Sequence, residues 1–325
     1  MNKTTCKKFG TTLAGVLALI GGSAKADTFG SGTNSFSIDF ADIGNAGNAD
    51  DAGAGGGNYS TPYGGVGYAY RMGTYEISQD AITRATASGL LNVAAGAHTG
   101  AEPAAGMTWY EAAAFVNWLN TSTGHPAAYQ LTGVTAMTLW GSEDAWQLDG
   151  ENLFRHKDAA YFLPSEDEWY KAAYHQNDGV TANYWDFATG SNTNPTQAVY
   201  GGTTPGSAVY GTGPAGDPAD VNLAGGLSAY GTMGQGGNIW EYQESAYDPG
   251  NDIAAEWRVL RGAWWQQSAP ALASHERSAI TVDSPSEVFG FRVASVPLGV
   301  PEPSSAVLLI GSGLMWIARR SRGTQ

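Results

Sequence analysis

The sequence predicts a loop-rich α+β domain in which two or three helices pack with short strands. Composition is the first reason, because 45 of the 325 residues are glycine and only 14% are charged, which is untypical of a helical bundle. The second reason is a pair of strong helix-start signals in the middle of the chain. The third is a set of short alternating segments before and after them, which is typical of strands.

The helices are predicted from their N-terminal capping patterns. Thr108 is followed three residues later by Glu111, and Ser165 is followed in the same way by Glu168. In such a capping box each side chain accepts a backbone N–H that the helix leaves free. Ser78 gives a weaker signal, since its hydroxyl alone can cap a first helix. The expected helices are Ser78 to Ala87, Thr108 to Asn120, and a third that begins at Ser165.

Strands are predicted where apolar residues alternate over short segments. Residues 124–155 show no strong period, so short strands and an insertion both stay open as alternatives. Residues 176–237 consist mainly of Gly, Asn, Asp, Thr and Pro. So long an irregular stretch is uncommon in a domain and is generally functional or tied to a metal. The expected strands lie within residues 68–77, 238–242, 257–264 and 289–293.

Residues 1–26 are predicted to be a secretory signal peptide. Three lysines lie among the first eight residues, and an apolar stretch follows from Leu13 to Ile20. Ala24-Lys25-Ala26 then places small residues at the two positions that a signal peptidase recognises. Cleavage there would make Asp27 the new N-terminus. The alternative interpretation is a buried N-terminal helix.

Residues 300–325 resemble a PEP-CTERM sorting tail. Pro301-Glu302-Pro303 is followed by the apolar run Ala306 to Ala318 and then by three arginines. The 13 residues of this run are fewer than the roughly 20 that a membrane-spanning helix needs. The resemblance implies processing by an exosortase, with transient membrane anchoring and delivery to the cell envelope or to an extracellular polysaccharide matrix.

Between these ends the sequence predicts one acidic exported domain. A segment rich in Gly, Asn and Asp, at 27–67, precedes the domain itself at 68–296. Without the four lysines of residues 1–26, and without the three arginines and Glu302 of the tail, 9 basic and 29 acidic residues remain, a formal charge of −20. This charge argues against nucleic acid as a partner and favours cations.

Four motifs, in order, resemble those of the formylglycine-generating, or sulfatase-modifying factor, family. Residues 162–169 are similar to its Leu-Pro-Thr-Glu-x-Glu-Trp signature, and residues 237–242 to its Gly-Asn-Val-Trp-Glu-Trp motif. Residues 258–264 resemble its Arg-Gly-Gly-Ser-Trp segment, and residues 290–293 match its closing strand. The resemblance implies a C-type-lectin-like fold with twisted antiparallel strands and two main helices.

The resemblance fails at the residues that carry the family's oxidase chemistry. In its enzymes two cysteines bind copper and oxidise a cysteine of the substrate. The corresponding positions here are about Gln267 and Leu272, and the one cysteine, Cys6, lies in the predicted signal peptide. Soft thiolates hold Cu(I), so copper is not expected. The five histidines form no pair at helical ligand spacing, so a catalytic iron site is not expected either.

Calcium is the metal that the resemblance favours, because the family holds structural calcium in two loops. Ca²⁺ accepts hard oxygen ligands, including backbone carbonyls and Asn, Asp or Glu side chains. The implied ligands are the Asn183 side chain and Tyr184 carbonyl in one loop, and the Gly237 and Ile239 carbonyls with the Glu241 carboxylate in the other.

Two observations weaken the second calcium set. A further side-chain ligand falls at Gly234, which has none to offer. Glu241 is also a candidate partner of Arg261 or Arg292, in which case its carboxylate serves the fold.

The favoured prediction is a non-catalytic domain that binds a glycan or a peptide. Its binding surface is expected where relatives bind peptide, and aromatic faces beside amides suit a sugar ring. The alternatives are a formylglycine-generating-type oxidoreductase that acts on a protein cysteine, and a structural matrix component without a specific ligand. The residues expected at the surface are Trp264, Trp265, Gln266, Gln267 and His275.

Overall fold

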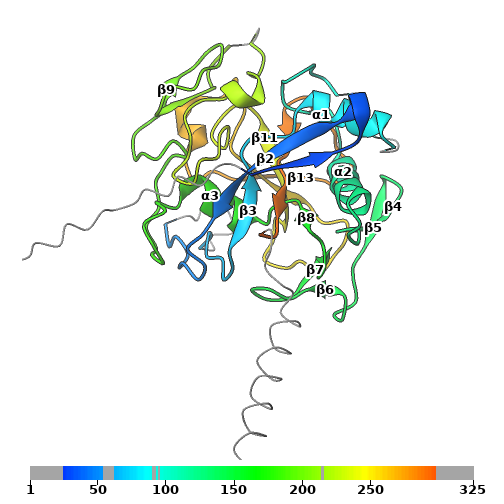
Figure 1. Cartoon of the computed structure of the whole chain (residues 1–325). Coiled ribbons are helices and arrows are strands. Elements are labelled where there is room, and N and C mark those ends of the chain that lie inside the picture. Colours follow the sequence, from blue (N-terminus) through cyan, green and yellow to red (C-terminus); the bar gives the residue numbers. More distant parts are fainter. Residues whose placement is uncertain (1–24, 54–61, 90–92, 94–95, 214–215, 298–325) are drawn as a thin grey trace, which may run out of the picture.

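The computed structural model describes residues 25–53, 62–89, 93, 96–213 and 216–297 (Figure 1). Nearly all of the predicted signal peptide and the whole of the predicted sorting tail therefore lie outside the described residues. None of the helices in the described part is long and apolar enough to cross a membrane.

All three predicted helices are confirmed, together with their caps. The Ser78 hydroxyl accepts the Ala81 N–H, and both capping boxes are complete, with side chain and backbone bonded in each direction. Three short 3-10 turns add to them at Gly32–Asn34, Val221–Leu223 and Ala269–Leu272. The helices are α1 (Gln79–Ala87), α2 (Trp109–Ser122) and α3 (Glu166–Tyr174).

Two sheets form the framework, and each expected strand segment contains at least part of a strand. In the first sheet every neighbouring pair is antiparallel, whereas in the second β11 and β14 run parallel. The first has the order β1 (Lys25–Phe29), β2 (Phe36–Ile43), β3 (Tyr70–Gly73), β15 (Ala294–Ser295) and β8 (Tyr161–Phe162). The second has the order β13 (Ser278–Ile280), β12 (Arg258–Arg261), β11 (Trp240–Ala246) and β14 (Phe289–Gly290).

The remaining strands form three two-stranded ribbons. Two of them lie within residues 124–155, so of the two alternatives for that segment the structure has short strands. The third lies in the irregular stretch 176–237. The ribbons are β4 (Gln130–Thr132) with β5 (Ala136–Thr138), β6 (Ala145–Trp146) with β7 (Asn152–His156), and β9 (Thr196–Gln197) with β10 (Ser207–Ala208).

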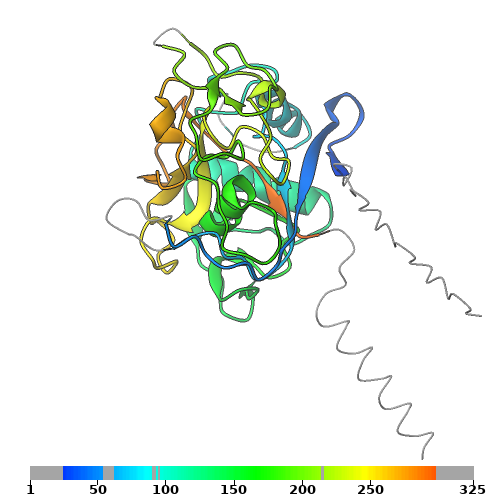
Figure 2. The same cartoon turned by 90° about the vertical axis from the view of Figure 1, so that its left-hand side faces the viewer.

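The fold begins well before residue 68, where the sequence placed the start of the domain. Strand β2 pairs with β1 on one side and with β3 on the other, so the first half of segment 27–67 belongs to the main sheet. The alternation of Phe36, Ile38 and Phe40 was the available signal, and the last two are buried. In Figure 2 this blue hairpin lies on one side of the molecule, and the yellow and orange strands of the second sheet lie on the other.

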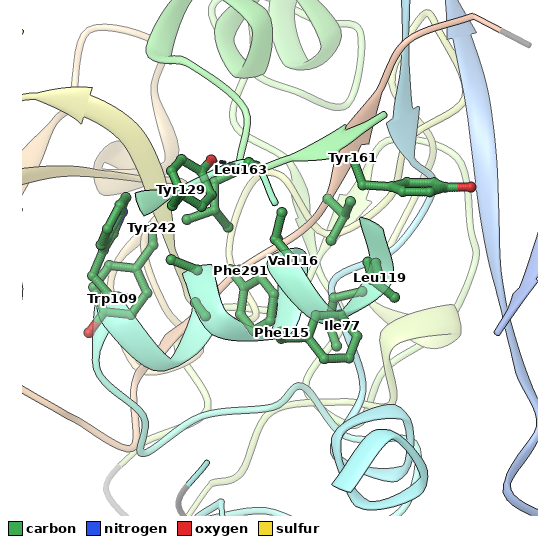
Figure 3. Close-up of a cluster of buried hydrophobic side chains, with 14 of the residues drawn as sticks. Ile77, Trp109, Phe115, Val116, Leu119, Tyr129, Tyr161, Leu163, Tyr242 and Phe291 are labelled. Atoms are coloured by element: carbon green, nitrogen blue, oxygen red, sulfur yellow. Dashed lines mark hydrogen bonds between the residues drawn. The ribbon is translucent and has the colours of Figure 1, made fainter. Parts of the chain in front are cut away.

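Helix α2 is the centre of the largest apolar cluster (Figure 3). Its side chains Trp109, Phe115 and Val116 are fully buried, and they pack with Tyr242 and Phe291 from the second half of the chain. Helix α2 therefore joins both sheets into one core.

Arg71 fastens both ends of the described chain to the first sheet. Its guanidinium donates to both carboxylate oxygens of Asp27, at 3.0 and 2.6 Å, and its Nε donates to the carbonyl of Val296. The Tyr161 hydroxyl also donates to Asp27. Both charged side chains are largely buried, at 2% and 11% exposed. Asp27, the residue expected at the new N-terminus, is thus a structural residue.

We expect Arg71→Met to lower the free energy of unfolding by roughly 3–5 kcal/mol, because it leaves the Asp27 carboxylate buried without its partner. The matched control is Arg84→Met, which breaks an exposed pair with Asp80 within α1 and should cost less than about 1 kcal/mol. Urea unfolding followed by tryptophan fluorescence measures both values. Equal losses would show that the Arg71 pair does not fasten the chain ends.

Candidate functional site

Trp265 lies in the core and not on a binding surface, so the expectation that it faces solvent is wrong. Its side chain is 3% exposed and packs with Val209 and Ile239. The indole Nε1 donates to the carbonyl of Gly216 at 2.6 Å. The backbone explains this inward turn, because Gly262 and Ala263 both have positive φ values, of 99° and 66°, which reverse the chain after β12.

The structure does not bring the other predicted surface residues into one site. Trp264, Gln266 and Gln267 are half-buried in the turn, and the Gln267 carbonyl accepts the Gly211 N–H. His275 is exposed and lies beside Glu276. Among the described residues, no contact joins His275 to the turn after β12 that holds Trp264, Gln266 and Gln267.

The places of the family's copper cysteines hold an amide and a hydrocarbon. Leu272 is 1% exposed and packs in an apolar cluster with Phe187 and Ala208. The side-chain carbonyl of Gln267 is buried and has no hydrogen-bond partner among the described residues. Neither side chain offers the soft sulfur donor that Cu(I) needs.

The second predicted calcium set does not fit the structure. The Glu241 carboxylate is fully buried and accepts two hydrogen bonds from Arg292, at 2.6 and 2.7 Å, and one from the Trp169 indole. Both oxygens are therefore already paired with a cation. The Gly237 carbonyl accepts the Ile239 N–H, so it also has a partner. Of the two arginines considered for Glu241, Arg292 is the partner.

The first predicted calcium set supplies too few oxygens. The Asn183 amide donates to the Asp178 carboxylate at 2.7 Å, and the Tyr184 carbonyl accepts the Gln176 side chain. Ca²⁺ takes roughly six to eight oxygen ligands, and this loop presents two with Asp178 beside them. Among the described residues no three His, Cys, Asp or Glu side chains are grouped to hold a metal ion.

Glu76 is a buried carboxylate that the sequence analysis missed. One of its oxygens accepts the Asn238 amide at 3.0 Å, and the other has no partner among the described residues. A side chain at Gly234 would collide with this carboxylate, so Glu76 fills the space that the missing Gly234 side chain leaves. Burial raises the pKa of Glu76 to about 7; the Arg292 charge opposes this rise and the Glu241 charge adds to it.

We expect Glu76→Gln to stabilise the protein at pH 8 but not at pH 5. A raised pKa means that the folded state holds a proton that the unfolded state releases, so wild-type stability falls as pH rises from about 5 to about 8. The neutral variant escapes this loss, which is roughly 2–3 kcal/mol. Unfolding free energies measured across this range test it, and parallel pH curves for the two proteins would contradict it.

The structure has a groove at the N-terminus of α3, which no sequence motif had indicated. It consists of two adjoining pockets, of about 210 and 140 Å³, that share Asp167, Ser245 and Asn251. We call this the α3 groove. Its other lining side chains include Tyr63, Tyr247, Asp248, Glu166 and Arg277 in the larger pocket, and Asp149, Glu151, Trp146 and Arg155 in the smaller one.

Paired charges form the floor of the α3 groove. Glu166 accepts two hydrogen bonds from Arg277, at 3.0 and 2.7 Å, and a third from Arg261. The Arg277 guanidinium also lies 4.3 Å from the ring centre of Tyr247 and 5.2 Å from that of Tyr63. These contacts fix the aromatic walls in place before any ligand arrives.

Asp167 lies where the two pockets meet. One of its oxygens accepts the Gly64 N–H at 2.9 Å. Burial raises the pKa of Asp167 to about 7; the Gly64 hydrogen bond opposes this rise, and the negative charge of Glu166 adds to it. The carboxyl group can thus accept hydrogen bonds and, when protonated, donate one.

We expect Trp265→Ala to lower the free energy of unfolding by roughly 3–5 kcal/mol, the cost of a cavity left by a buried tryptophan. Trp257→Ala is the matched control, because Trp257 is 57% exposed and its loss should cost about 0.5 kcal/mol or less. Chemical unfolding of both variants measures the difference. If Trp265→Ala were as mild as Trp257→Ala, Trp265 would not be a core residue.

Comparison with known proteins places these features in a family. A model of the sulfatase-modifying factor enzyme 1-like domain matches residues 51–296. The inactive C-alpha-formylglycine-generating enzyme 2 of Mus musculus is 33% identical over 143 residues, which cover 41% of this chain and 42% of that protein. The Bos taurus protein of the same name is 32% identical over 142 residues, 41% of this chain and 43% of that one. The match thus spans less than half of these relatives.

Three solved structures share the fold. Treponema denticola variable protein 1 has a TM-score of 0.56 and 21% identity, and the match covers 85% of this chain and all of that one. PvdO from Pseudomonas aeruginosa has a TM-score of 0.51 and 15% identity over 85% of this chain and all of its own. CarF has a TM-score of 0.51 and 16% identity, with 80% and 98% covered. At these identities the likeness concerns the fold alone, and it agrees with the C-type-lectin-like fold of the family.

Proposed function

Because the chain belongs to the sulfatase-modifying factor family but lacks its thiols, we propose that it serves as a non-catalytic, ligand-binding member. The observation that carries this proposal is that other residues occupy the positions of the two copper-binding cysteines. Gln267 and Leu272 stand where the thiolates belong, and Leu272 is packed among apolar side chains. A copper ion there would meet hydrocarbon and an amide, which are poor ligands for Cu(I).

The relatives support the same proposal, since both curated proteins are named inactive enzymes. The chain has few other candidates for redox chemistry, because its one cysteine is Cys6 and its histidines are scattered. A domain that keeps the fold and loses the reactive groups still presents a shaped surface. Ligand binding is the function that such a surface can perform.

We place the protein outside the cytoplasm, at the cell envelope or in an extracellular matrix. The support is the order of signals in the sequence, with a signal peptide pattern at one end and a sorting tail at the other. In this proposal an exosortase processes the tail, and the ligand is a glycan or a peptide. A calcium ion in the Asn183 loop is kept in the proposal as a stiffening element. The oxygens of Asn183, Tyr184 and Asp178 do not complete a shell of roughly six to eight ligands, so water would supply the rest.

The test of the non-catalytic role is an oxidation assay. The purified protein, loaded with Cu(I), is incubated in air with a peptide that contains the family's substrate cysteine, and mass spectrometry follows the conversion of that cysteine to formylglycine. We expect no conversion and no stoichiometric copper, in contrast to a family enzyme that has both cysteines. Conversion that survives Cys6→Ser would establish the oxidoreductase alternative and overturn the proposal.

Calcium is tested separately by chelation. If the Asn183 loop holds calcium, EDTA should lower the melting temperature, and added Ca²⁺ should restore it. Asn183→Ala should abolish this response, whereas Gly234→Asn should not create a second one because Glu76 occupies that space. No change of melting temperature with EDTA would remove calcium from the proposal.

A further inference from the structure

We propose that the α3 groove binds a glycan without acidic groups, and that it prefers hexoses that carry an amino group. The inference deepens the proposed function and rests on it, since it assumes that the domain binds a ligand. It names the site and the chemical class, neither of which follows from the family.

The size of the groove is the first support. Its two pockets adjoin through Asp167 and are both open to solvent, so a chain molecule can lie across them. Together they reach the lower end of the range of roughly 300–1,000 Å³ that small-molecule sites occupy. The start of α3, the end of β11 and the β6–β7 ribbon form part of its walls, and loop residues within 62–68 and 247–251 form most of the rest.

Aromatic side chains give the groove a face for a sugar ring. The Tyr247 N–H donates to the Trp257 carbonyl, which continues the pairing of Ala246 with Arg258 along the β11–β12 hairpin. Side chains of opposite residues lie on the same face of a sheet, so we place Trp257 next to Tyr247 at the edge of the groove, although Trp257 itself lines neither pocket. The Trp257 side chain is 57% exposed, which leaves its flat indole open to solvent. Exposed indoles suit the apolar face of a pyranose.

The free polar groups of the groove suit sugar hydroxyls. Asp167 uses one oxygen for Gly64, which leaves the other for a ligand. Asn251 accepts the Ala246 N–H through its oxygen, so its amide nitrogen is left as a donor. The Ser245 oxygen accepts the Glu166 N–H, which leaves the hydroxyl proton to donate. Carboxylate, amide and hydroxyl groups in one groove match the mixed donors and acceptors of a saccharide.

The charge of the groove excludes anionic ligands. Its two arginines are already engaged, Arg277 with Glu166 and Arg155 with Glu168 and Glu244. In contrast, the carboxylates of Asp149, Glu151 and Asp248 form no ion pair in the described structure, and Asp167 adds to their charge when it is ionised. A uronic acid would meet this excess of negative charge, whereas the ammonium of an amino sugar would be attracted by it.

A basic peptide would share the charge of this ligand but not its rings. The open indole of Trp257 at the rim of the groove favours the broad apolar face of a sugar ring over an extended lysine side chain. For this reason we propose the glycan. The two classes are separated by experiment.

The experiment measures binding of four hexameric probes to the purified protein by isothermal titration calorimetry at pH 7 and moderate salt. They are a glucosamine oligomer, its N-acetylated counterpart, a galacturonate oligomer and hexalysine. We expect the first to bind most tightly, the second at least about tenfold more weakly, and the third not at all. Hexalysine that bound as tightly as the glucosamine oligomer would overturn the proposal in favour of a peptide or of unspecific charge.

Two variants locate the site. Trp257→Ala removes the exposed indole, and Asp167→Asn removes the ionisable carboxyl group but keeps an oxygen that can accept the Gly64 N–H. Each should weaken binding of the glucosamine oligomer by about tenfold or more without lowering the melting temperature. The matched control is Tyr200→Ala, since Tyr200 is 95% exposed and, unlike Trp257, has no described pairing with a residue that lines the groove.

The outcomes separate this inference from the proposed function. Binding that survives both variants, or is weakened equally by Tyr200→Ala, would overturn the assignment of the groove and leave the binding role intact. Absence of binding to all four probes would overturn the ligand class. Conversion of the cysteine peptide in the oxidation assay would instead overturn the proposed function itself.

Discussion

The fold depends on the burial of the acidic first turn of α3 against arginines from elsewhere in the chain. Glu166 is held by Arg261 and Arg277, and Glu168 by Arg155, with every one of these groups nearly or fully buried. Removing such charges from water costs several kcal/mol for each ion, and only complete pairing offsets this cost. The helix is therefore docked in the orientation in which both glutamates meet their arginines. Long loops surround this helix, so its position is fixed by ion pairs and not by long strands.

The same constraint explains why a groove is found at α3 and not at the turn after β12. Arg277 pairs with Glu166 and also donates to the Tyr247 carbonyl, so it holds the end of β11 beside the start of the helix. Asp167, between the two paired glutamates, accepts the Gly64 N–H and pairs with none of these arginines. Its carboxylate is left between two pockets. At the turn, by contrast, Gly262 and Ala263 reverse the chain so sharply that Trp265 enters the core. The aromatic and amide residues at 264–267, although adjacent in sequence, thus do not form a binding surface there.

Local signals in the sequence were sufficient for the helices, because a capping box is complete within four residues. They were also sufficient to predict the strands near the family motifs, and the sequence itself shows that the two copper-binding cysteines are missing. They were insufficient for β1 and β2, whose alternation is masked by the glycines and asparagines that follow, although Ile38 and Phe40 carried a usable period. The pairing of Glu241 with Arg292 spans 51 residues, and no spacing rule chooses it over Arg261. For the same reason the groove could not be predicted, since its walls come from five separate parts of the chain.

The family motifs themselves show why this chain can lose the chemistry and keep the fold. The signature around α3 contains Glu166, Glu168 and Trp169, and each is a member of the buried polar network. The other motifs supply Glu241, Arg261 and Arg292, and Arg155 and Arg277 from outside the motifs complete it. The network therefore does not include the two thiol positions, where Gln267 and Leu272 now lie. Because the motifs are explained by folding alone, their presence does not indicate oxidase activity, and a domain without the thiols can retain them for the stability they provide. The family motifs of this chain therefore identify its framework, and they do not identify its ligand.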